Sequence, residues 1–397
     1  MRDRQAHLLA MLLIAGSVTL IGAAPKATCA NETFARTGST SSLLPCYSDL
    51  SVLYGTEQLD TGRIPYLDPC VASDRPCDEY PVLTMLTMWA AARTGGLVAG
   101  YAGFFWANVL VALAAALLCI WALERMGART ILFAAAPALA LYATLNWDLV
   151  AVACATIATL LLLQGGSTGP GAWLGVGAAA KLYPALLTIP FGLQRWRDRS
   201  PRDGIRLVAS AFIVWLAIDI AFMVAAPTAW SEVFRFNRDR GADFESLWTA
   251  ACEAHLCFSS GALNVLVPVI TVAAVTVVWR RVKRNHPDTP DWMLGFPIIV
   301  VVVLTGKFWS PQYALWLLPW FAMSRVPTTT WASYQASEVI EYFVRSAFMT
   351  GPVPAVSLRV LAVVVMIRAI LLFRCLIAWT RDPKPVGDMT TRSIRVG

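Results

Sequence analysis

Residues 98–123 read VAGYAGFFWANVLVALAAALLCIWAL, a continuous apolar run without Asp, Glu, Lys or Arg. A helix needs about 20 apolar residues to cross the hydrocarbon core of a bilayer, and this run exceeds that length. Comparable runs lie at 8–24, 205–226, 262–282 and 355–379. The chain is therefore predicted to be an all-α polytopic integral membrane protein.

The composition of the whole chain points to the same class. Hydrophobic residues make up 57% of the 397 residues and charged residues only 14%, and the mean hydropathy is +0.59. A chain of this composition has too little polar surface to cover a soluble globule. Further partial crossings are expected where apolar runs are shorter or interrupted, at 131–145, 148–163, 171–194, 291–306, 311–324 and 331–350.

Lys and Arg collect in a few segments, and their positions predict the orientation. Short loops that carry Lys and Arg stay on the cytoplasmic side of the membrane. Such positions are Arg2 and Arg4, the segments 195–206 and 280–284, and the tail after residue 380. Both termini are therefore predicted to be cytoplasmic. The basic excess, which gives a pI near 9.0, follows from this orientation and does not indicate a nucleic-acid partner.

This orientation predicts two outer loops, at 25–80 and 227–261. Both belong to a single predicted transmembrane domain over 1–379, which is followed by a cytoplasmic tail at 380–397. The first loop carries four Lys or Arg against eight Asp or Glu, a formal charge of −4. The apolar run 8–24 could also be a signal peptide with a small-residue cleavage site. The many later spans favour a retained helix.

Cysteine placement supports this orientation. Six of the nine cysteines fall in the two outer loops, and disulfides persist only in oxidising compartments. No zinc site is predicted, because the loops lack the paired spacings of zinc ligands. Other connectivities fit the sequence, but the simplest local pairings are Cys70 with Cys77, Cys252 with Cys257 and, by remainder, Cys29 with Cys46.

The segment 171–194 must run outward and back, because both of its neighbours have to meet the cytoplasm. It is too short for two full crossings, so a broken helix pair is expected, with the break near Lys181, Tyr183 and Pro184. Non-helical backbone at membrane depth is tolerated only beside protein or a wet cavity, and discontinuous helices often line binding sites. The count becomes about 12 full or partial crossings.

The acidic first loop contains a short predicted helix. Between Asp49 and Asp60, the side chains of Leu50, Leu53 and Tyr54 share one helical face. We therefore expect a helix on the outer membrane surface that begins at Asp49, within a structured first outer loop. Asp49 then either caps this helix or takes part in a reaction through its carboxylate.

Several Lys and Arg residues lie on the predicted outer side, although short loops that carry Lys and Arg usually stay on the cytoplasmic side. Lys181 lies in an otherwise apolar stretch, where an ionisable side chain is costly and indicates a function, unless it snorkels to the interface. Lys307 lies at an outer turn, and Arg235, Arg238 and Arg240 are in the second outer loop. A phosphate group is a partner that such cations favour. Solvated loop charges are the alternative.

Short motifs follow one another between residues 45 and 320. They are SDLSVLY at 48–54, GRIPY at 62–66, EYP at 79–81, NWDL at 146–149, AKLYP at 180–184, RG at 240–241 with ESL at 245–247, and Lys307 with SPQY at 310–313, Trp316 and Pro319. The ordered set resembles the family 87 glycosyltransferases, membrane enzymes of the C superfamily. The insertion that contains Cys70 and Cys77 departs from the family pattern. The resemblance therefore does not assign the acceptor side of the site.

This resemblance implies a fold, an activity and a set of site residues. The fold would be a GT-C-type helical bundle. The activity would be transfer of a sugar, typically mannose, from a polyprenyl-phosphate donor to a lipid or glycan acceptor at the outer face of the plasma membrane, with inversion. The sequence requires no cofactor and no metal, although Asp49 with another carboxylate could hold a metal ion. Asp49 would be the general base. The substrate-binding residues would be Tyr54, Tyr66, Glu79, Tyr80, Asn146, Asp148, Lys181, Arg240, Glu245, Lys307, Gln312 and Tyr313.

Within that set, Lys181, Arg240 and Lys307 would stabilise the departing phosphate, and Glu79 and Asp148 would bind sugar hydroxyls or orient the base. A transporter or lipid flippase would also explain a broken helix, but it leaves the outer-loop motifs without a role. An inactive scaffold is a third class. The high Ala, Val, Arg and Trp content is typical of a high-GC bacterium, such as an actinobacterium.

Overall fold

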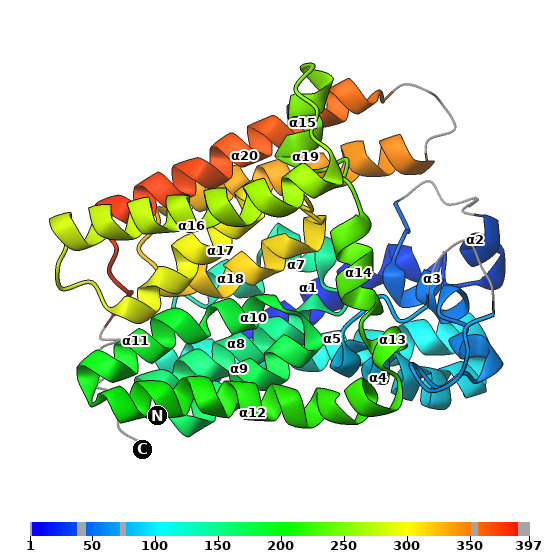
Figure 1. The fold of residues 1–397 in the computed structure, drawn as a ribbon, viewed down its shortest axis with the longest axis horizontal. Coiled ribbons are helices and arrows are strands. Elements are labelled where there is room, and N and C mark those ends of the chain that lie inside the picture. The colour runs from blue at the N-terminus through cyan, green and yellow to red at the C-terminus, as the bar shows by residue number, and fades with distance from the viewer. Residues whose placement is uncertain (1, 38–44, 72–76, 351–355, 388–397) are drawn as a thin grey trace.

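The computed structural model describes residues 2–37, 45–71, 77–350 and 356–387. In these residues the chain is helical, apart from one isolated bridge between Ser324 and Pro385. Most long helices run side by side along the long axis of the molecule (Figure 1). Those long and apolar enough to cross a membrane are α1 (Arg2–Ala27), α12 (Pro201–Ala225), α16 (Ser260–Asn285), α20 (Leu358–Arg381) and the run Val82–Met126. The chain is thus confirmed to be all-helical with several candidate membrane spans.

The run over Val82–Met126 is two segments rather than one rod. It comprises α4 (Val82–Ala91), the π turn η2 (Ala92–Gly96) and α5 (Leu97–Met126). The backbone leaves helical geometry at Ala99 and at Gly100, whose φ of +56° favours glycine. Gly95 and Gly103 approach so closely that a Cβ on either would overlap the other's carbonyl. The chain therefore folds back here, which the apolar run alone does not predict.

The helix breaks at Lys181, where the sequence pattern predicts it. The backbone of Lys181 is extended, with φ −155° and ψ 134°, between α9 (Thr168–Ala180) and the short α10 (Tyr183–Leu186). Both α9 and the following α11 (Thr188–Asp198) lie against α12, since Gly175 faces Ala211 and Gly192 faces Val208. The segment therefore runs along α12 and back. It packs on its other side against α8 (Asp148–Leu163).

The rest of the bundle is built from shorter helices and from α19 (Thr328–Thr350). The shorter ones are α6 (Ile131–Ala134), α7 (Pro137–Tyr142), η3 (Asp291–Leu294), α17 (Gly295–Thr305), η4 (Pro311–Tyr313) and α18 (Ala314–Met323). Arg129, before α6, donates to the carbonyls of Phe321, Ser324 and Val326 at the end of α18. These bonds satisfy carbonyls that a helix end leaves without partners.

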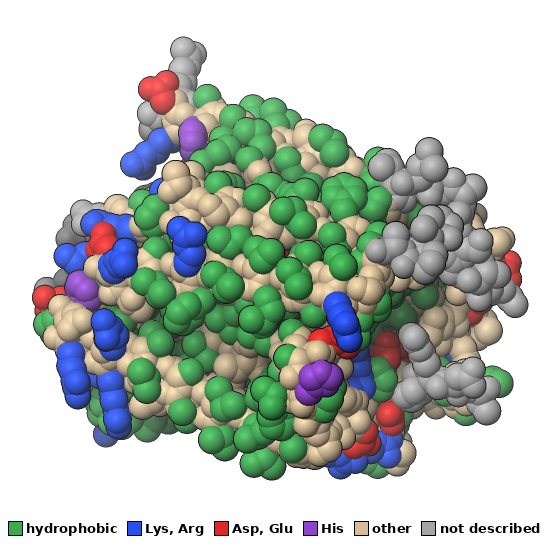
Figure 2. All heavy atoms as spheres, turned by 90° about the horizontal axis from the view of Figure 1, so that it is seen from above, with side chains coloured by type: hydrophobic (Ala, Val, Ile, Leu, Met, Phe, Trp, Pro, Cys, Tyr) green, Lys and Arg blue, Asp and Glu red, His purple; other side chains and the backbone are tan. Residues whose placement is uncertain are grey.

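The two ends of the molecule differ in charge. The N-terminus and the end of α20 lie at the same end, at the left of Figure 1. Lys and Arg gather at that end, and hydrophobic side chains cover a broad zone beside it (Figure 2). Exposed apolar side chains on the long helices α12, α16 and α20 include Ile213, Val272 and Ile370. Such a surface suits a multi-pass membrane protein.

The opposite end carries the two loops that the charge pattern places outside. The first contains α2 (Glu32–Thr37), α3 (Asp49–Thr56) and η1 (Leu59–Thr61); the second contains α13 (Pro227–Trp230), α14 (Glu232–Asp239) and α15 (Leu247–Glu253). The predicted helix from Asp49 ends four residues before Asp60, because Gln58 adopts a left-handed conformation with φ +56°. Disulfides join Cys29 to Cys46, Cys70 to Cys77 and Cys252 to Cys257, which suits an extracytoplasmic location.

Candidate functional site

A cavity of about 210 Å³ lies between the two outer loops and the break after α9. Its walls come from the segment before α4, from the break itself, from α14 and from the turn around η4. Both polar and aromatic side chains face it. The lining residues are Glu79, Tyr80, Pro81, Lys181, Leu182, Tyr183, Val233, Phe236, Asn237, Arg240, Phe308, Ser310, Gln312, Tyr313 and Trp316.

Asp49 lies directly behind the Tyr80 wall of this cavity. Its Oδ1 accepts a hydrogen bond from the Tyr47 hydroxyl at 2.7 Å, and its Oδ2 accepts from Asn146 Nδ2 at 2.7 Å and from the Tyr80 hydroxyl at 3.2 Å. The cap of α3 is Ser48, whose Oγ accepts from Leu50 N. The capping role considered for Asp49 thus belongs to its neighbour, and the half-buried Asp49 side chain is left for other contacts.

Tyr80 connects Asp49 to the cavity. Its hydroxyl also accepts a hydrogen bond from Asn146 Nδ2 at 2.9 Å, and the Asn146 Oδ1 accepts from Trp147 N at 2.6 Å. Burial raises the pKa of the Tyr80 phenol well above its ordinary value, and the Asp49 carboxylate raises it further. The phenol therefore stays protonated and continues to donate to Asp49.

Lys181 projects from the helix break into the cavity, with Asp148 behind it. Lys181 Nζ lies 3.2 Å from Asp148 Oδ2, and Asp148 Oδ1 accepts from Trp316 Nε1 at 2.6 Å. The ammonium also lies 5.4 Å from the ring centre of Tyr80 and 5.8 Å from that of Tyr313. Because Asp148 is fully buried, it holds the lysine in place rather than facing the cavity.

Stacked aromatic rings form the floor beside Lys181. The Trp316 ring lies between Tyr313, at a centroid distance of 3.9 Å, and Tyr183, at 4.2 Å. Gln312, which is nearly buried, lines the same wall. Flat aromatic surface of this kind packs against the apolar faces of sugars or against isoprenoid chains.

Arg240 is a second cation on the cavity wall. Its guanidinium lies 4.9 Å from the Phe236 ring centre and 4.7 Å from that of Phe308, while Asp243 is 3.8 Å away. Lys307 does not line the cavity. Its Nζ donates to the carbonyls of Arg238 and Arg240 and to Asn264 Oδ1, at 2.7 to 3.1 Å, and burial lowers its pKa. Lys307 therefore fixes the loop that carries Arg240.

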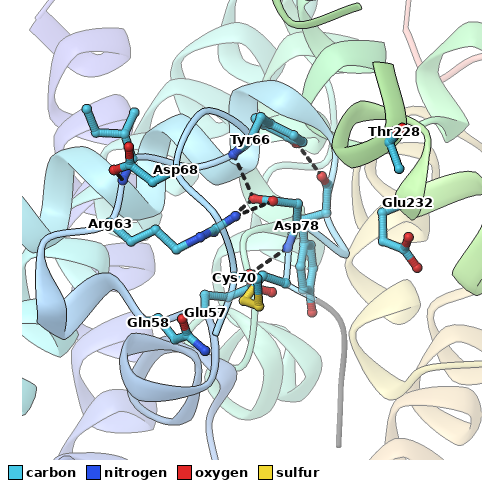
Figure 3. Close-up of polar contacts among 12 residues, drawn as sticks. Glu57, Gln58, Arg63, Tyr66, Asp68, Cys70, Asp78, Thr228 and Glu232 are labelled. Atoms are coloured by element: carbon cyan, nitrogen blue, oxygen red, sulfur yellow. Dashed lines mark hydrogen bonds and ion pairs between the residues drawn. A yellow bond between two sulfur atoms is a disulfide. The ribbon is translucent and has the colours of Figure 1, made fainter. Parts of the chain in front are cut away.

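Tyr66 supports the cavity from behind, in the core of the first outer loop (Figure 3). Its hydroxyl donates to the carbonyl of Tyr80 at 2.7 Å, and its backbone N–H donates to Asp78 Oδ1 at 3.0 Å. Asp78 forms a buried ion pair with Arg63, and its N–H donates to Glu57 Oε2 at 2.8 Å. Buried charges of this kind are stable only when paired and hydrogen-bonded.

Two predicted site residues lie elsewhere. Tyr54 packs between Tyr101 and Phe104 of α5, with ring centres at 5.0 and 4.8 Å. Glu245 is buried and contacts Arg345 of α19 through an ion pair. Tyr47 and Phe236, by contrast, contact site residues but are not among the predicted site residues. The sequence feature that could have pointed to Tyr47 is its position directly before the SDLSVLY motif at 48–54.

No protein-family model matches this chain, and no curated protein is similar to it. Among the described residues, no group of three or more His, Cys, Asp or Glu side chains is arranged to hold a metal ion. At the end of the molecule that carries the disulfides, the cavity brings together two cations, Lys181 and Arg240, and several aromatic rings. The half-buried Asp49 carboxylate lies directly behind its Tyr80 wall.

Proposed function

We propose that this chain is a membrane glycosyltransferase that moves a sugar, with mannose the first candidate, from a polyprenyl-phosphate donor to a lipid or glycan acceptor at the outer membrane face. The observation that supports this proposal most directly is the position of Tyr80 between Asp49 and Lys181. Its hydroxyl donates to Asp49, and its ring lies beside Lys181 in the wall of a cavity that also contains Arg240. A base and phosphate-binding cations are thereby close together.

Asp49 is assigned as the general base. An acceptor hydroxyl attacks C1 of the sugar, its proton passes to the Asp49 carboxylate, and the bond between C1 and the phosphate oxygen breaks. The electron pair leaves with the polyprenyl phosphate, and a single displacement turns a β-linked donor into an α-linked product. The two Asp49 oxygens accept three hydrogen bonds, and a carboxylate offers about four acceptor positions, so one is left for the acceptor.

Lys181 and Arg240 are assigned to the phosphate. Negative charge grows on the departing phosphate, and cations fixed in place before the reaction stabilise that charge most effectively. Lys181 is fixed by Asp148, and Arg240 is flanked by two phenyl rings. Tyr183, Tyr313 and Trp316 then offer apolar surface to the sugar or to the first isoprene units.

The fold supports a lipid-linked donor. A GT-C-type bundle of about 12 full or partial crossings would present the cavity at the outer end of the spans, so that an isoprenoid tail stays in the bilayer while its phosphate reaches the interface. The disulfides at this end agree with an extracytoplasmic site in the plasma membrane. The mechanism requires no cofactor.

The test is transfer of radiolabelled mannose from polyprenyl-phosphate mannose to membrane lipids by the purified protein in lipid nanodiscs. Asp49→Asn keeps the size of the side chain and removes the base, so its kcat should fall by about a hundredfold or more. Asp60→Asn is the matched control, because Asp60 is an exposed carboxylate of the same loop. Equal loss in both variants, or full activity in Asp49→Asn, would reject Asp49 as the base.

A transporter or lipid flippase is the second candidate, favoured by the broken helix and the Lys181–Asp148 pair. It would move the labelled lipid between leaflets without turnover of the donor. It should also tolerate Asp49→Asn. If mannose is not transferred, an arabinose donor tests the sugar before the class is abandoned.

A further inference from the structure

The segment 45–47, directly before the α3 cap, is held by α19, a helix nearly 300 residues away in sequence. The Tyr342 hydroxyl donates to the carbonyl of Pro45 at 3.1 Å. One turn further, the Arg345 guanidinium lies 5.9 Å from the centre of the Tyr47 ring. Cations at this distance from an aromatic face are attracted to it. Two side chains of one helix face therefore hold this segment.

The position of Arg345 is in turn fixed by residues of the second outer loop. Arg345 forms an ion pair with Glu245, whose side chain is only 2% exposed, and it lies 5.8 Å from the ring of Phe244. A guanidinium held by a buried carboxylate has few other positions available. The Tyr47 ring thus packs against a rigid surface made by α19 and the second outer loop.

Further contacts at this segment come from the disulfide between Cys46 and Cys29 and from the turn between α7 and α8. Ser48 Oγ donates to the carbonyl of Thr144 at 2.6 Å, and Asp49 N donates to the carbonyl of Leu145 at 2.9 Å. These bonds fix the Asp49 backbone. Its carboxylate orientation also depends on Tyr47, which donates to Oδ1 at 2.7 Å, and α19 contacts the ring that carries this hydroxyl.

We propose that Tyr342 and Arg345, with Glu245 as the partner of Arg345, are positioning residues for Asp49. They hold the segment 45–47 so that the Tyr47 hydroxyl fixes the orientation of the carboxylate behind Tyr80. This inference rests on the proposed function for the role of Asp49 as base. Misplacement of a catalytic group by about 1 Å costs up to about a hundredfold in rate.

Two variants test the proposal. Tyr342→Phe removes only the hydroxyl that holds Pro45. The double variant Arg345→Met/Glu245→Met removes the ion pair without leaving a buried unpaired charge. The matched control is Tyr334→Phe, a buried tyrosine on the same helix, about two turns away, that packs against Phe321.

Two readouts separate this proposal from the proposed function. The first is hydrogen exchange of the backbone amides at 46–50, which needs no substrate. Both variants should exchange there about tenfold faster or more, and the control should match wild type. The second is sugar transfer. In both variants kcat should fall about 10- to 100-fold while KM for the donor changes less than about threefold.

Unchanged exchange at 46–50 would overturn the inference, whatever the activity. Faster exchange with an unchanged kcat would also overturn it, because the segment would then be loosened without effect on the base. Faster exchange together with a lower kcat supports it. If wild type transfers no sugar, the proposed function fails, and the positioning role fails with it even where exchange increases.

Discussion

Glu57 is fully buried at the end of α3, where its Oε2 accepts a hydrogen bond from Asp78 N. Burial raises its pKa to about 8, and the nearby carboxylates of Glu79 and Asp78 add to this effect. The folded protein therefore binds a proton that the unfolded chain releases near pH 4.5. The stability that this proton contributes is lost as the pH rises through about 8.

We predict that Glu57→Gln removes part of this pH dependence. The amide keeps an acceptor for Asp78 N and carries no charge, so at about pH 8.5 the variant should be more stable than wild type by about 1 to 3 kcal/mol. At about pH 5 the two should differ little, since Glu57 is then protonated in the folded protein. Thermal unfolding in detergent at both pH values measures this difference.

Asp60→Asn provides the control for Glu57→Gln, because it makes the same chemical change at an exposed position of the same loop. It should show the pH dependence of wild type. A Glu57→Gln variant that follows wild type across the whole range would contradict the assignment of this proton to Glu57.

At the scale of the element, the break after α9 brings an ammonium beside Asp148 at the start of α8. The Asp148 side chain is fully buried, and Lys181 is its one cationic partner among the ion pairs of the described residues. Removing one member of such a pair leaves an uncompensated charge, whereas removing both often costs little. The broken helix should therefore depend on the pair as a unit.

Lys181→Met should lower the free energy of unfolding by about 3 kcal/mol or more, because Asp148 would be left charged in a buried position. Lys181→Met/Asp148→Asn should recover most of that loss. Denaturant unfolding in mixed micelles compares the three proteins. If the double variant is as unstable as the single one, Lys181 contributes packing rather than charge.

At the scale of the whole molecule, the charge difference between the two ends predicts a fixed orientation in the membrane. Asp239 is exposed at the disulfide-bearing end, and Asp288 is exposed at the opposite end, in the turn after α16. Short basic loops remain cytoplasmic. The two positions should therefore lie on opposite sides of the membrane.

Asp239→Cys should react with a membrane-impermeant maleimide in intact cells, and Asp288→Cys should react only after the cells are opened. The native background should be low, because Cys119, Cys154 and Cys375 are buried and the other six cysteines are in disulfides. Labelling of Asp288→Cys in intact cells would reverse the orientation.

The elements were more predictable from the sequence than the site was. Apolar runs located the long helices, and the break at Lys181 followed from the length of 171–194 between basic loops. The fold-back at Gly100 was not predicted, because an apolar run has the same composition whether it is straight or bent. Within the site, the sequence pointed to Asp49 and Lys181. It did not indicate that the Lys307 ammonium donates its hydrogen bonds to carbonyls of the second outer loop.

Composition and residue order are enough to predict that this chain is apolar, helical and charged differently at its two ends. Which side chains contact one another depends instead on how the helices pack. Asp49, Tyr80, Asn146 and Arg345 come from segments up to about 300 residues apart and come together only when the helices pack. The physical reason is that local pattern sets the shape of each helix, whereas packing sets the distances between them.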